Sequence, residues 1–332
     1  MIRHKIINSD EISIKLEGDG FYQNINWLKA INEGNGYEYM AVESSYDMRV
    51  VISIFFTTHK WPFKLAGAPL PGCFIDYMNP ISGPEVNKDQ LTVVLISQQE
   101  FLAGLGYSYI EWRVRQNIIN VEDFCSKTNS KHRESGTLLL RISQSEDEMW
   151  AGMKSRSRNM VRKAEKNGAS VELMSLKHVP EFYDMLTKMY SSQKKIPPHS
   201  LNLYLSVVRN LVKSNQLLFV SVKHNNHPVA MGMFPYNDHE IHFLSGASTI
   251  DGNSIGANNL MHWFVIQFSI KNKLDFYDFG GLGVPSIDKF KKSFGGSYYS
   301  YSKIVWETSL ASLARKLFLY VLKIRKIRKI WR

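Results

Sequence analysis

The sequence predicts an α+β protein made of two units of one design, packed as one body with mixed sheets and followed by a basic C-terminal helix. Three observations predict this class. A series of elements (helix, meander of three strands, helix, strand) occurs twice. The length of 332 residues is about twice that of a typical domain. Residues 310–332 hold eight basic residues and no acid, which leaves only +3 of the net charge of +11 for the rest of the chain.

The first unit is predicted from β-branched and aromatic runs and from apolar residues at helical spacing. Residues 37–44 and 48–56 are two such runs around a short polar turn, which predicts a hairpin. The other expected elements are a helix at 21–33, a third strand at 73–78, a helix at 87–106 and a strand at 107–115.

The second unit repeats the first at an offset of 180 residues. Its hairpin is expected to join strands 217–224 and 227–236 through Asn225 and Asn226. The other expected elements are a helix at 200–215, a strand at 240–248, a helix at 254–273 and a strand at 274–281.

Two further helices are predicted from their end signals. Ser145 begins a capping box and Gly168 suits a C-terminal cap, so one long helix is expected over 145–168, at the start of the second unit. Ser286 is expected to cap a short helix at 287–294.

The composition excludes several classes. Apolar residues make up 44% and charged residues 21%, as in folded soluble proteins. With two cysteines, a disulfide scaffold or a cysteine-ligated metal is not expected, and the ten histidines lack ligand spacing, so no metal site is expected. The first 18 residues lack the apolar core of a signal peptide, and no run of 18 apolar residues occurs. A cytoplasmic protein is therefore expected.

Three short motifs carry a resemblance. They are W-x(7)-R-x(3)-R-K-A-E-K-x-G from Trp150 to Gly168, YDFGG at 277–281, and F-K-x-x-F-G at 290–295. In this order, within a repeated pattern, they resemble the tandem GNAT-fold acyltransferases of the Fem type. The resemblance covers 145–305 directly and 20–120 through the repeat. It implies a first GNAT-like unit at 1–140 that binds acceptor without catalysis, a catalytic second unit at 145–308, and a basic helix at 309–332.

The resemblance implies three alternative functions. Fem-type enzymes attach amino acids to peptidoglycan precursors, and relatives N-acylate nucleotide-linked amino sugars. The first hypothesis is transfer from an acyl-CoA thioester to the amine of a nucleotide-linked deoxyamino sugar, for envelope polysaccharide. The second is an aminoacyl-tRNA donor and a peptidoglycan-precursor acceptor; the lack of a heptad-rich arm favours the first. The third is a non-catalytic GNAT pair that binds envelope precursors or a membrane partner through its basic tail.

The donor is expected at two places. Residues 251–258 occupy the position of the pyrophosphate loop Q/R-x-x-G-x-G/A but keep only its middle glycine. Unpaired N–H groups at a helix N-terminus would still attract phosphate, although a turn with Asn capping explains the segment equally. Gly280 and Gly281 let a ligand approach the backbone, and the family's pantetheine arm lies beside this strand. The predicted loop contacts are Asn253, Ser254, Gly256 and Asn258.

The catalytic candidates are Lys291, Asp278 and His242. In the resembling family Lys291 faces the acyl transfer, where a cation would stabilise the oxyanion; otherwise it is a surface lysine. Asp278 would orient the acceptor amine or accept its proton, or would only cap the turn. His242 would act as a general base or be structural. A final strand carries three alternating tyrosines, Tyr298, Tyr299 and Tyr301. One of them would protonate the leaving thiolate, or all three would serve only in packing.

The acceptor candidates come from both units. Arg158 and Arg162 lie at i and i+4 on one helix face and would hold a diphosphate, or form a solvated basic face. Asp76 and Tyr77, in the glycine- and proline-rich segment 68–84, would contact the sugar or belong to an irregular connection.

The C-terminal tail has apolar residues at helical spacing with Lys and Arg on the opposite side. Three interpretations remain open: a helix docked on its own domain, a helix on the anionic inner face of the membrane, or a contact with tRNA. The apolar positions are Leu313, Leu317, Tyr320, Val321, Ile324, Ile327 and Trp331.

Overall fold

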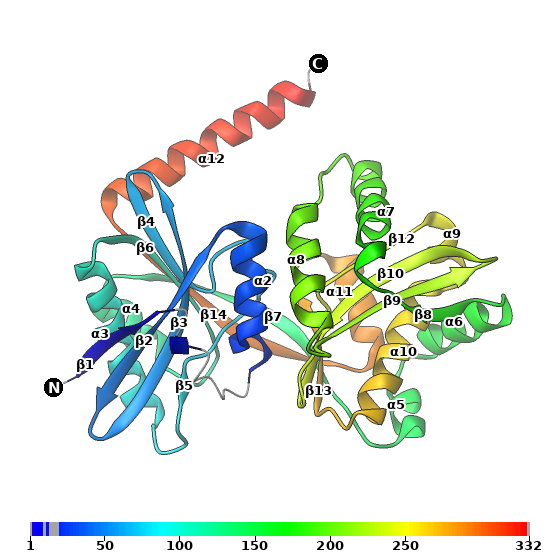
Figure 1. The fold of residues 1–332 in the computed structure, drawn as a ribbon, viewed down its shortest axis with the longest axis horizontal. Coiled ribbons are helices and arrows are strands. Elements are labelled where there is room, and N and C mark those ends of the chain that lie inside the picture. Colours follow the sequence, from blue (N-terminus) through cyan, green and yellow to red (C-terminus); the bar gives the residue numbers. More distant parts are fainter. Residues whose placement is uncertain (1, 9–10, 13–19, 331–332) are drawn as a thin grey trace.

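The structure is a computed structural model that describes residues 2–8, 11–12 and 20–330, and it contains two units joined by long strands (Figure 1). Both predicted hairpins are confirmed, at β2–β3 and β9–β10. Both turns place two consecutive residues at positive φ: Asp47 and Met48 in the first, Asn225 and Asn226 in the second. This conformation matches the right-handed twist of the flanking strands.

The first unit surrounds an aromatic core that includes Trp27, Phe55 and Trp112, each at most 1% exposed. The helices α3 and α4 pack together beside the sheet. Its elements are β1 (Arg3–Ile7), η1 (Phe21–Gln23), α2 (Ile25–Asn35), β2 (Glu38–Tyr46), β3 (Arg49–Lys60), β4 (Phe63–Ala68), β5 (Ile81–Ser82), α3 (Lys88–Gly104), β6 (Tyr107–Arg115), α4 (Val121–Thr128) and β7 (Lys131–Arg141).

The second unit places α10 in contact with β9, β10 and β13. The helices α7 and α8 pack together around Phe182, Tyr204 and Phe219, against the four-stranded sheet. Its elements are α5 (Glu146–Gly152), α6 (Ser155–Lys166), β8 (Ser170–Leu173), η2 (Leu176–His178), α7 (Val179–Ser192), α8 (Leu201–Val212), β9 (Leu217–His224), β10 (His227–Pro235), β11 (Glu240–His242), β12 (Ser245–Ser248), α9 (Ile250–Ile255), α10 (Ala257–Lys271), β13 (Phe276–Gly281), α11 (Pro285–Lys291), η3 (Lys292–Phe294) and β14 (Ser297–Glu307); α12 (Ser309–Ile330) follows.

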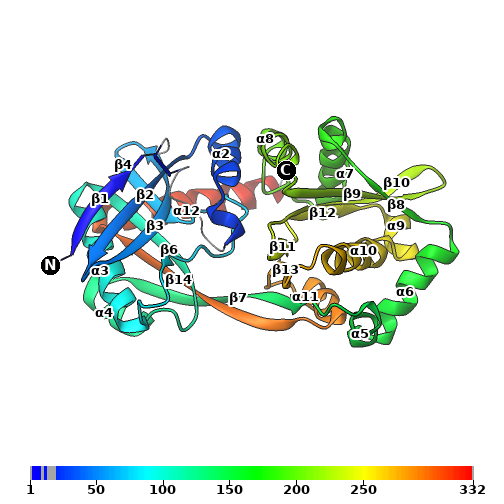
Figure 2. The ribbon, with the colours of Figure 1, turned by 60° about the horizontal axis from the view of Figure 1, so that its bottom comes forward.

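The two units exchange their last strands. Among the described residues, ten strands form one sheet with the order β1-β2-β3-β4-β6-β14-β7-β13-β11, with β5 on β3, and four form a second sheet, β12-β10-β9-β8. The last strand of the first unit, β7, pairs with β13 of the second, whereas the last strand of the second unit, β14, pairs with β6 of the first. Figure 2 shows β7 and β14 running side by side from one unit to the other. One continuous sheet therefore joins the units.

The helices α2 and α8 form a second connection between the units (Figure 1). Their backbones approach closely, since a Cβ built at Gly34 would lie 2.8 Å from the Cα of Leu203. The Ser206 hydroxyl donates to the carbonyl oxygen of Ala30 at 2.8 Å. The predicted α+β class of two units packed as one body is confirmed, while the boundaries 1–140, 145–308 and 309–332 stay a prediction.

Four local predictions are wrong. The single strand expected at 240–248 is divided into β11 and β12, which belong to different sheets. Residues 73–78 form no strand; β4 is the third strand of the meander, and the prolines at 69 and 71 start an irregular connection instead. The segment 145–168 forms two helices, because the chain is extended at Met153 and Lys154. Ser286 caps nothing, since α11 begins one residue earlier at Pro285.

The C-terminal helix is α12. Among the described helices, none has the length and apolar character that crossing a bilayer requires. The predicted apolar residue Trp331 and the side chains of Ile324 and Ile327 lie outside the part of the chain that the structure describes.

Candidate active site

A gap opens in the second unit where two strands separate. The strand β11 pairs with β13 in parallel as far as His242 and Asp278, and the N–H of Phe243 donates to the Asp278 carbonyl oxygen at 2.8 Å. The next residue, Leu244, instead donates to the carbonyl oxygen of Met233 on β10 at 3.0 Å. As a result β12 is an edge strand, and no described strand pairs with β13 on this side beyond Asp278. The outer edge of β12 keeps backbone N–H and C=O groups available to a ligand, whereas the Gly280 N–H bonds to Asp278 and the carbonyl oxygens of Gly280 and Gly281 bond to Lys291.

A cleft of about 340 Å³ lies at this gap, between the two units. Another cavity, of about 590 Å³, lies far along the sheet at the base of α12 and contains none of these strand ends. The separated strands and the convergence of both units make the smaller cleft the candidate active site. Its lining residues are Gly72, Phe74, Ile75, Asp76 and Arg113 from the first unit and His199, Phe243, Leu244, Phe279, Gly280, Gly281 and Lys291 from the second.

Lys291 reaches the cleft from α11. This helix is held against the preceding turn because the Gly283 N–H donates to both carboxylate oxygens of Asp288, at 3.1 and 3.2 Å. The Lys291 ammonium donates to the carbonyl oxygens of Gly280 at 3.1 Å and Gly281 at 2.7 Å, and the residue is 6% exposed. Burial lowers the pKa of Lys291, while nearby carboxylates oppose that shift. Two ammonium hydrogens are engaged, so one remains for a ligand.

Asp76 faces Lys291 across the end of β13. A Cβ built at Gly280 would lie 3.5 Å from Asp76 Oδ2 and 3.9 Å from Lys291 Nζ. Burial and then the charge of Asp278 raise the pKa of Asp76 to about 6, against a backbone hydrogen bond from Gly281 and the charge of Lys291. A carboxylate with this pKa can accept a proton near neutral pH. The predicted residues Asp76 and Lys291 thus meet at the predicted glycines.

Gly280 allows this approach for a conformational reason. Its φ is +74°, and the register of β13 against β7 shifts between Asp278 and Gly281. Glycine adopts this left-handed conformation without steric cost, and bulges of this kind recur beside active sites.

Asp278 holds the turn in place. Its Oδ1 accepts hydrogen bonds from the Gly280 N–H at 2.7 Å and from the Thr137 hydroxyl, and its Oδ2 accepts from the Tyr77 hydroxyl at 3.0 Å. Tyr77 in turn accepts from Arg115 Nη2 at 3.0 Å. Both Asp278 and Tyr77 are buried, and neither lines the cleft. The structure therefore places them beneath the site, where they position its backbone.

His242 lies in a buried charged cluster behind the gap. Its Nε2 is 3.2 Å from Glu240 Oε1 and its Nδ1 is 3.9 Å from Asp278 Oδ2, while Arg115 Nη2 is 3.9 Å from Glu240 Oε2. Burial alone would lower the pKa of His242, but the Glu240 carboxylate raises it above its usual value. Burial alone would raise the pKa of Glu240, but His242 and the Phe21 N–H lower it to about 2. This cluster ties together the two units.

The predicted donor loop is a short helix. Residues 250–255 form α9, and a Cβ built at Gly256 would lie 2.3 Å from the Met160 carbonyl oxygen, so Gly256 lets α6 approach closely. Asn253 Oδ1 accepts from Asn258 Nδ2 at 2.8 Å, and the Ser254 carbonyl oxygen accepts from Lys163 at 2.8 Å. These contacts are internal. No side chain caps α10, which begins at Ala257, and phosphate binding there stays a prediction.

The predicted arginine pair reaches α5. Arg158 Nη1 donates to the carbonyl oxygens of Ala151 at 2.9 Å and Met153 at 2.7 Å, which satisfies the end of that helix. The Arg162 guanidinium lies 5.2 Å from the centre of the Trp150 ring. Neither arginine lines the cleft, and their grip on a diphosphate stays a prediction.

The tyrosines of β14 differ in exposure. Tyr298 is 55% exposed, whereas Tyr301 is 7% exposed. Burial and the charge of Asp76 raise the pKa of Tyr301 to about 12. Tyr299 stacks against Arg115, whose guanidinium lies 5.1 Å from its ring centre.

The sequence analysis missed the residues that support Asp76. Arg113 on β6 donates to the carbonyl oxygen of Ile75 at 2.9 Å and to Glu111 at 2.6 Å, and Lys303 of β14 lies 2.9 Å from Glu111. Glu111 is fully buried. A signal for them exists, because Glu111, Arg113 and Arg115 alternate on one face of an otherwise apolar strand.

Comparisons with known proteins agree with this fold. Residues 152–292 match the family described as Acetyltransferase (GNAT) domain. No curated protein matches the sequence. Residues 152–292 of the second unit thus match a GNAT acetyltransferase domain, which supports an N-acyltransferase of the GNAT type.

Solved structures define the tandem arrangement. FemX has 14% identity and a TM-score of 0.69, with 90% of this chain and 96% of that chain covered. A tandem GNAT protein from the clavulanic acid biosynthesis pathway has 8% identity and a TM-score of 0.57, with 92% and 98% covered. L-PGS from Bacillus licheniformis has 10% identity and a TM-score of 0.55, with 96% of each chain covered. The chain has the tandem GNAT fold of the Fem type.

Proposed function

We propose that the protein transfers an acyl group from an acyl-CoA thioester to the amine of a nucleotide-linked deoxyamino sugar, for envelope polysaccharide. The observation that carries this proposal is that Asp76 and Lys291 lie on either side of Gly280 in one cleft. The first unit contributes Asp76 and the second contributes Lys291. A base and a cation on opposite sides of an accessible backbone suit an amine that attacks a polarised carbonyl.

The transfer requires three tasks. The acceptor ammonium must lose a proton, and we assign its acceptance to the Asp76 carboxylate, which lines the cleft. The amine nitrogen then forms a bond to the thioester carbon, and the negative charge that develops on the oxygen is stabilised by the free N–H of Lys291. The intermediate collapses as the carbon–sulfur bond breaks and the second nitrogen proton passes to the departing sulfur, which gives an amide and the free thiol. The cleft itself contributes by holding both reactants in contact.

The donor is proposed to lie in the gap between β12 and the end of β13. The pantetheine arm of CoA is extended and carries amide groups, so it can bond to free backbone groups of a strand edge as an added strand would. Phe243 and Phe279 line this gap and would cover its apolar segments.

An aminoacyl-tRNA donor with a peptidoglycan-precursor acceptor is the second candidate. Two observations favour it: the likeness to FemX and the replacement of an open pyrophosphate loop by α9. The tight contact of Gly256 with α6 removes the glycine that such a loop would use to approach a diphosphate.

The test is a thermal-shift titration with free CoA, acetyl-CoA and a panel of nucleotide sugars, followed by a thiol-release assay. A ligand at about 100 times its Kd stabilises a fold by roughly 2.7 kcal/mol. Stabilisation by CoA together with thiol release in the presence of an amino sugar is expected. A response to a peptidoglycan-precursor nucleotide without one to CoA would favour the second candidate. No response and no turnover with either donor would leave a non-catalytic binding protein.

A further inference from the structure

The helix α12 exposes an unusual amount of apolar surface. Figure 1 shows it projecting away from the first unit. Between 317 and 321 five consecutive large apolar residues are exposed, so this turn is apolar around its whole circumference. One face of a protein body would cover only one side of such a turn. The exposed fractions are 57% for Leu317, 62% for Phe318, 51% for Leu319, 64% for Tyr320 and 44% for Val321.

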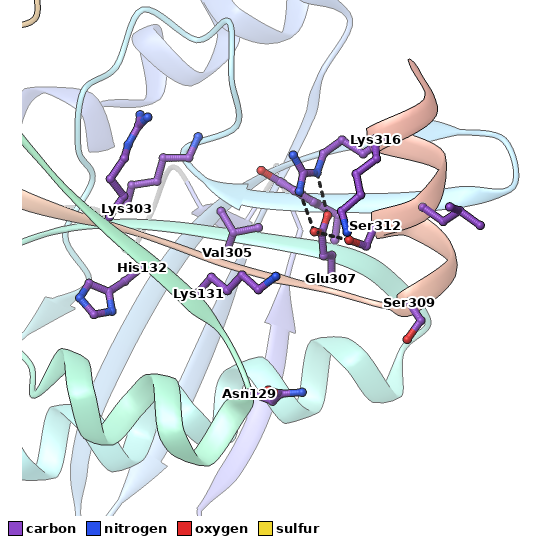
Figure 3. A pocket seen from close by; sticks show the side chains of 13 residues that line it. Asn129, Lys131, His132, Lys303, Val305, Glu307, Ser309, Ser312 and Lys316 are labelled. Atoms are coloured by element: carbon purple, nitrogen blue, oxygen red, sulfur yellow. Dashed lines mark hydrogen bonds and ion pairs between the residues drawn. The ribbon is translucent and has the colours of Figure 1, made fainter. Parts of the chain in front are cut away.

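The larger cavity, of about 590 Å³, lies at the base of the same helix. Figure 3 shows Lys131 of β7 and Val305 and Glu307 of β14 beside Ser312 and Lys316 of α12. We name this cavity the basal cleft. Five Lys or Arg side chains and a single carboxylate line it: Lys131, Arg133, Lys303, Arg315, Lys316 and Glu307.

That one carboxylate is already engaged. Arg315 donates two hydrogen bonds to Glu307, at 2.7 and 2.8 Å, and the Ser312 hydroxyl donates a third at 2.8 Å. These hydrogen bonds from Arg315 and Ser312 lower the pKa of Glu307, although its partial burial opposes the shift. Lys303 contacts the buried Glu111. Lys131, Arg133 and Lys316 are exposed and leave the basal cleft with an excess of positive charge.

We infer that α12 and the basal cleft form a docking surface for an anionic phospholipid bilayer. The apolar turn at 317–321 enters the acyl–headgroup boundary, where aromatic and aliphatic side chains are stable, and the basal cleft receives phosphate headgroups. The sequence that follows, 322–332, adds six more Lys and Arg residues and no acid. A bilayer surrounds an inserted turn on all sides, and its anionic surface matches the charge on both sides of that turn.

Two other occupants fit less well. RNA would neutralise the basic residues but would leave the aliphatic side chains at Leu317 and Leu319 in water. A second copy of this chain could cover apolar surface, but it would bring two strongly basic segments together. The inference is independent of the proposed acyl transfer, because none of the residues that carry it lines the candidate active site.

The test is co-sedimentation of the full chain with phosphatidylcholine vesicles prepared with and without phosphatidylglycerol. Lys131→Gln/Arg133→Gln should weaken partitioning into anionic vesicles about 25-fold, at about fivefold for each cation near an anionic surface. The control Lys194→Gln/Lys195→Gln, which removes equal charge from an exposed loop of the second unit, should bind like the unmodified chain. Leu317→Ser/Phe318→Ser should reduce binding at least tenfold.

Several outcomes would overturn the inference. Two of them concern vesicles: equal binding to both kinds of vesicle, and equal effects of the basal-cleft and control variants. The other two point to a different partner: binding to tRNA without binding to vesicles, and dimerisation without vesicle binding that Leu317→Ser/Phe318→Ser abolishes. Turnover with soluble substrates is measured in parallel, and the Lys131/Arg133 variant should retain it. If the chain fails to bind vesicles but keeps turnover, the membrane-docking inference is wrong and the proposed function is untouched. If every variant lacks turnover, the proposed function is wrong.

Discussion

Substitution of Lys291 by alanine gives the sharpest test of the candidate active site. Two of the three ammonium hydrogens bind the carbonyl oxygens of Gly280 and Gly281, so a single N–H is left to meet the developing oxyanion. Loss of one preorganised oxyanion donor typically lowers kcat by roughly 10²- to 10³-fold, or about 2.7–4 kcal/mol. With one donor available, a decrease of about 10²-fold is expected for Lys291→Ala.

The KM values should change much less than kcat, since the interaction forms mainly in the transition state. The fold should survive, because the freed Gly281 carbonyl lies at an exposed residue and can bind water. Steady-state thiol release and a thermal melt, measured on the same samples, separate the two effects.

The matched control comes from the same short segment. Lys289→Ala and Lys292→Ala remove the same charge at exposed positions, and both should keep kcat within about twofold because neither lines the cleft. An unchanged kcat in Lys291→Ala, or an equal loss in the controls, would refute the assignment of Lys291 as the oxyanion donor.

Three further predictions concern the charged groups and the packing around the site. For Asp76, kcat/KM should fall about tenfold per pH unit below about pH 6, and Asp76→Asn should remove that limb and lower kcat/KM by roughly 10²-fold or more. The pKa of Asp76 is higher in the folded than in the unfolded chain, so the free energy of unfolding should also fall as pH rises from about 4 through 6. Asp76→Asn should abolish this fall in urea titrations, and a fall that persists in the variant would contradict the raised pKa of Asp76. Gly256→Ala should destabilise the fold by clearly more than Gly168→Ala, which costs about 1 kcal/mol, since both have positive φ but only Gly256 faces a backbone carbonyl; equal costs would contradict the close α6 contact. Glu240→Gln should cost about 3 kcal/mol by leaving buried His242 and Arg115 without their carboxylate, and it should reduce the acid-side loss of stability below pH 4.5, which a pH series of melts would detect.

The repeated architecture could be predicted because its signals are local. Apolar runs with β-branched or aromatic residues mark β2, β3, β9 and β10, and turn residues such as Asn225 and Asn226 mark where each hairpin reverses. The apolar periodicity of α3 and α8 is equally local. The weak strand signals failed: FKLAGA forms β4 without any β-branched residue, while the strand-like residues 73–78 form no strand.

The site was predicted only in part. Two motifs identified part of the site: the two glycines that end YDFGG and the lysine of F-K-x-x-F-G. The structure brings these residues, Gly280, Gly281 and Lys291, together in the cleft. The role of the loop at 251–258 depended on whether it stayed an open turn, and that was decided by the packing of α9 and Gly256 against α6. Spacing within one segment carries no information on such contacts.

What the sequence by itself determined about this protein is the repeat, the elements with strong periodicity, the basic C-terminal helix and the motifs of the second unit. The tertiary structure decided the exchange of β7 and β14, the approach of Asp76 to Lys291 and the support of Asp76 by Arg113. The physical reason is that local signals come from the conformational preferences of neighbouring residues, whereas these contacts join residues that are far apart in the chain. Their geometry is set by strand pairing and by the packing of whole units, which the chain reaches only when it folds.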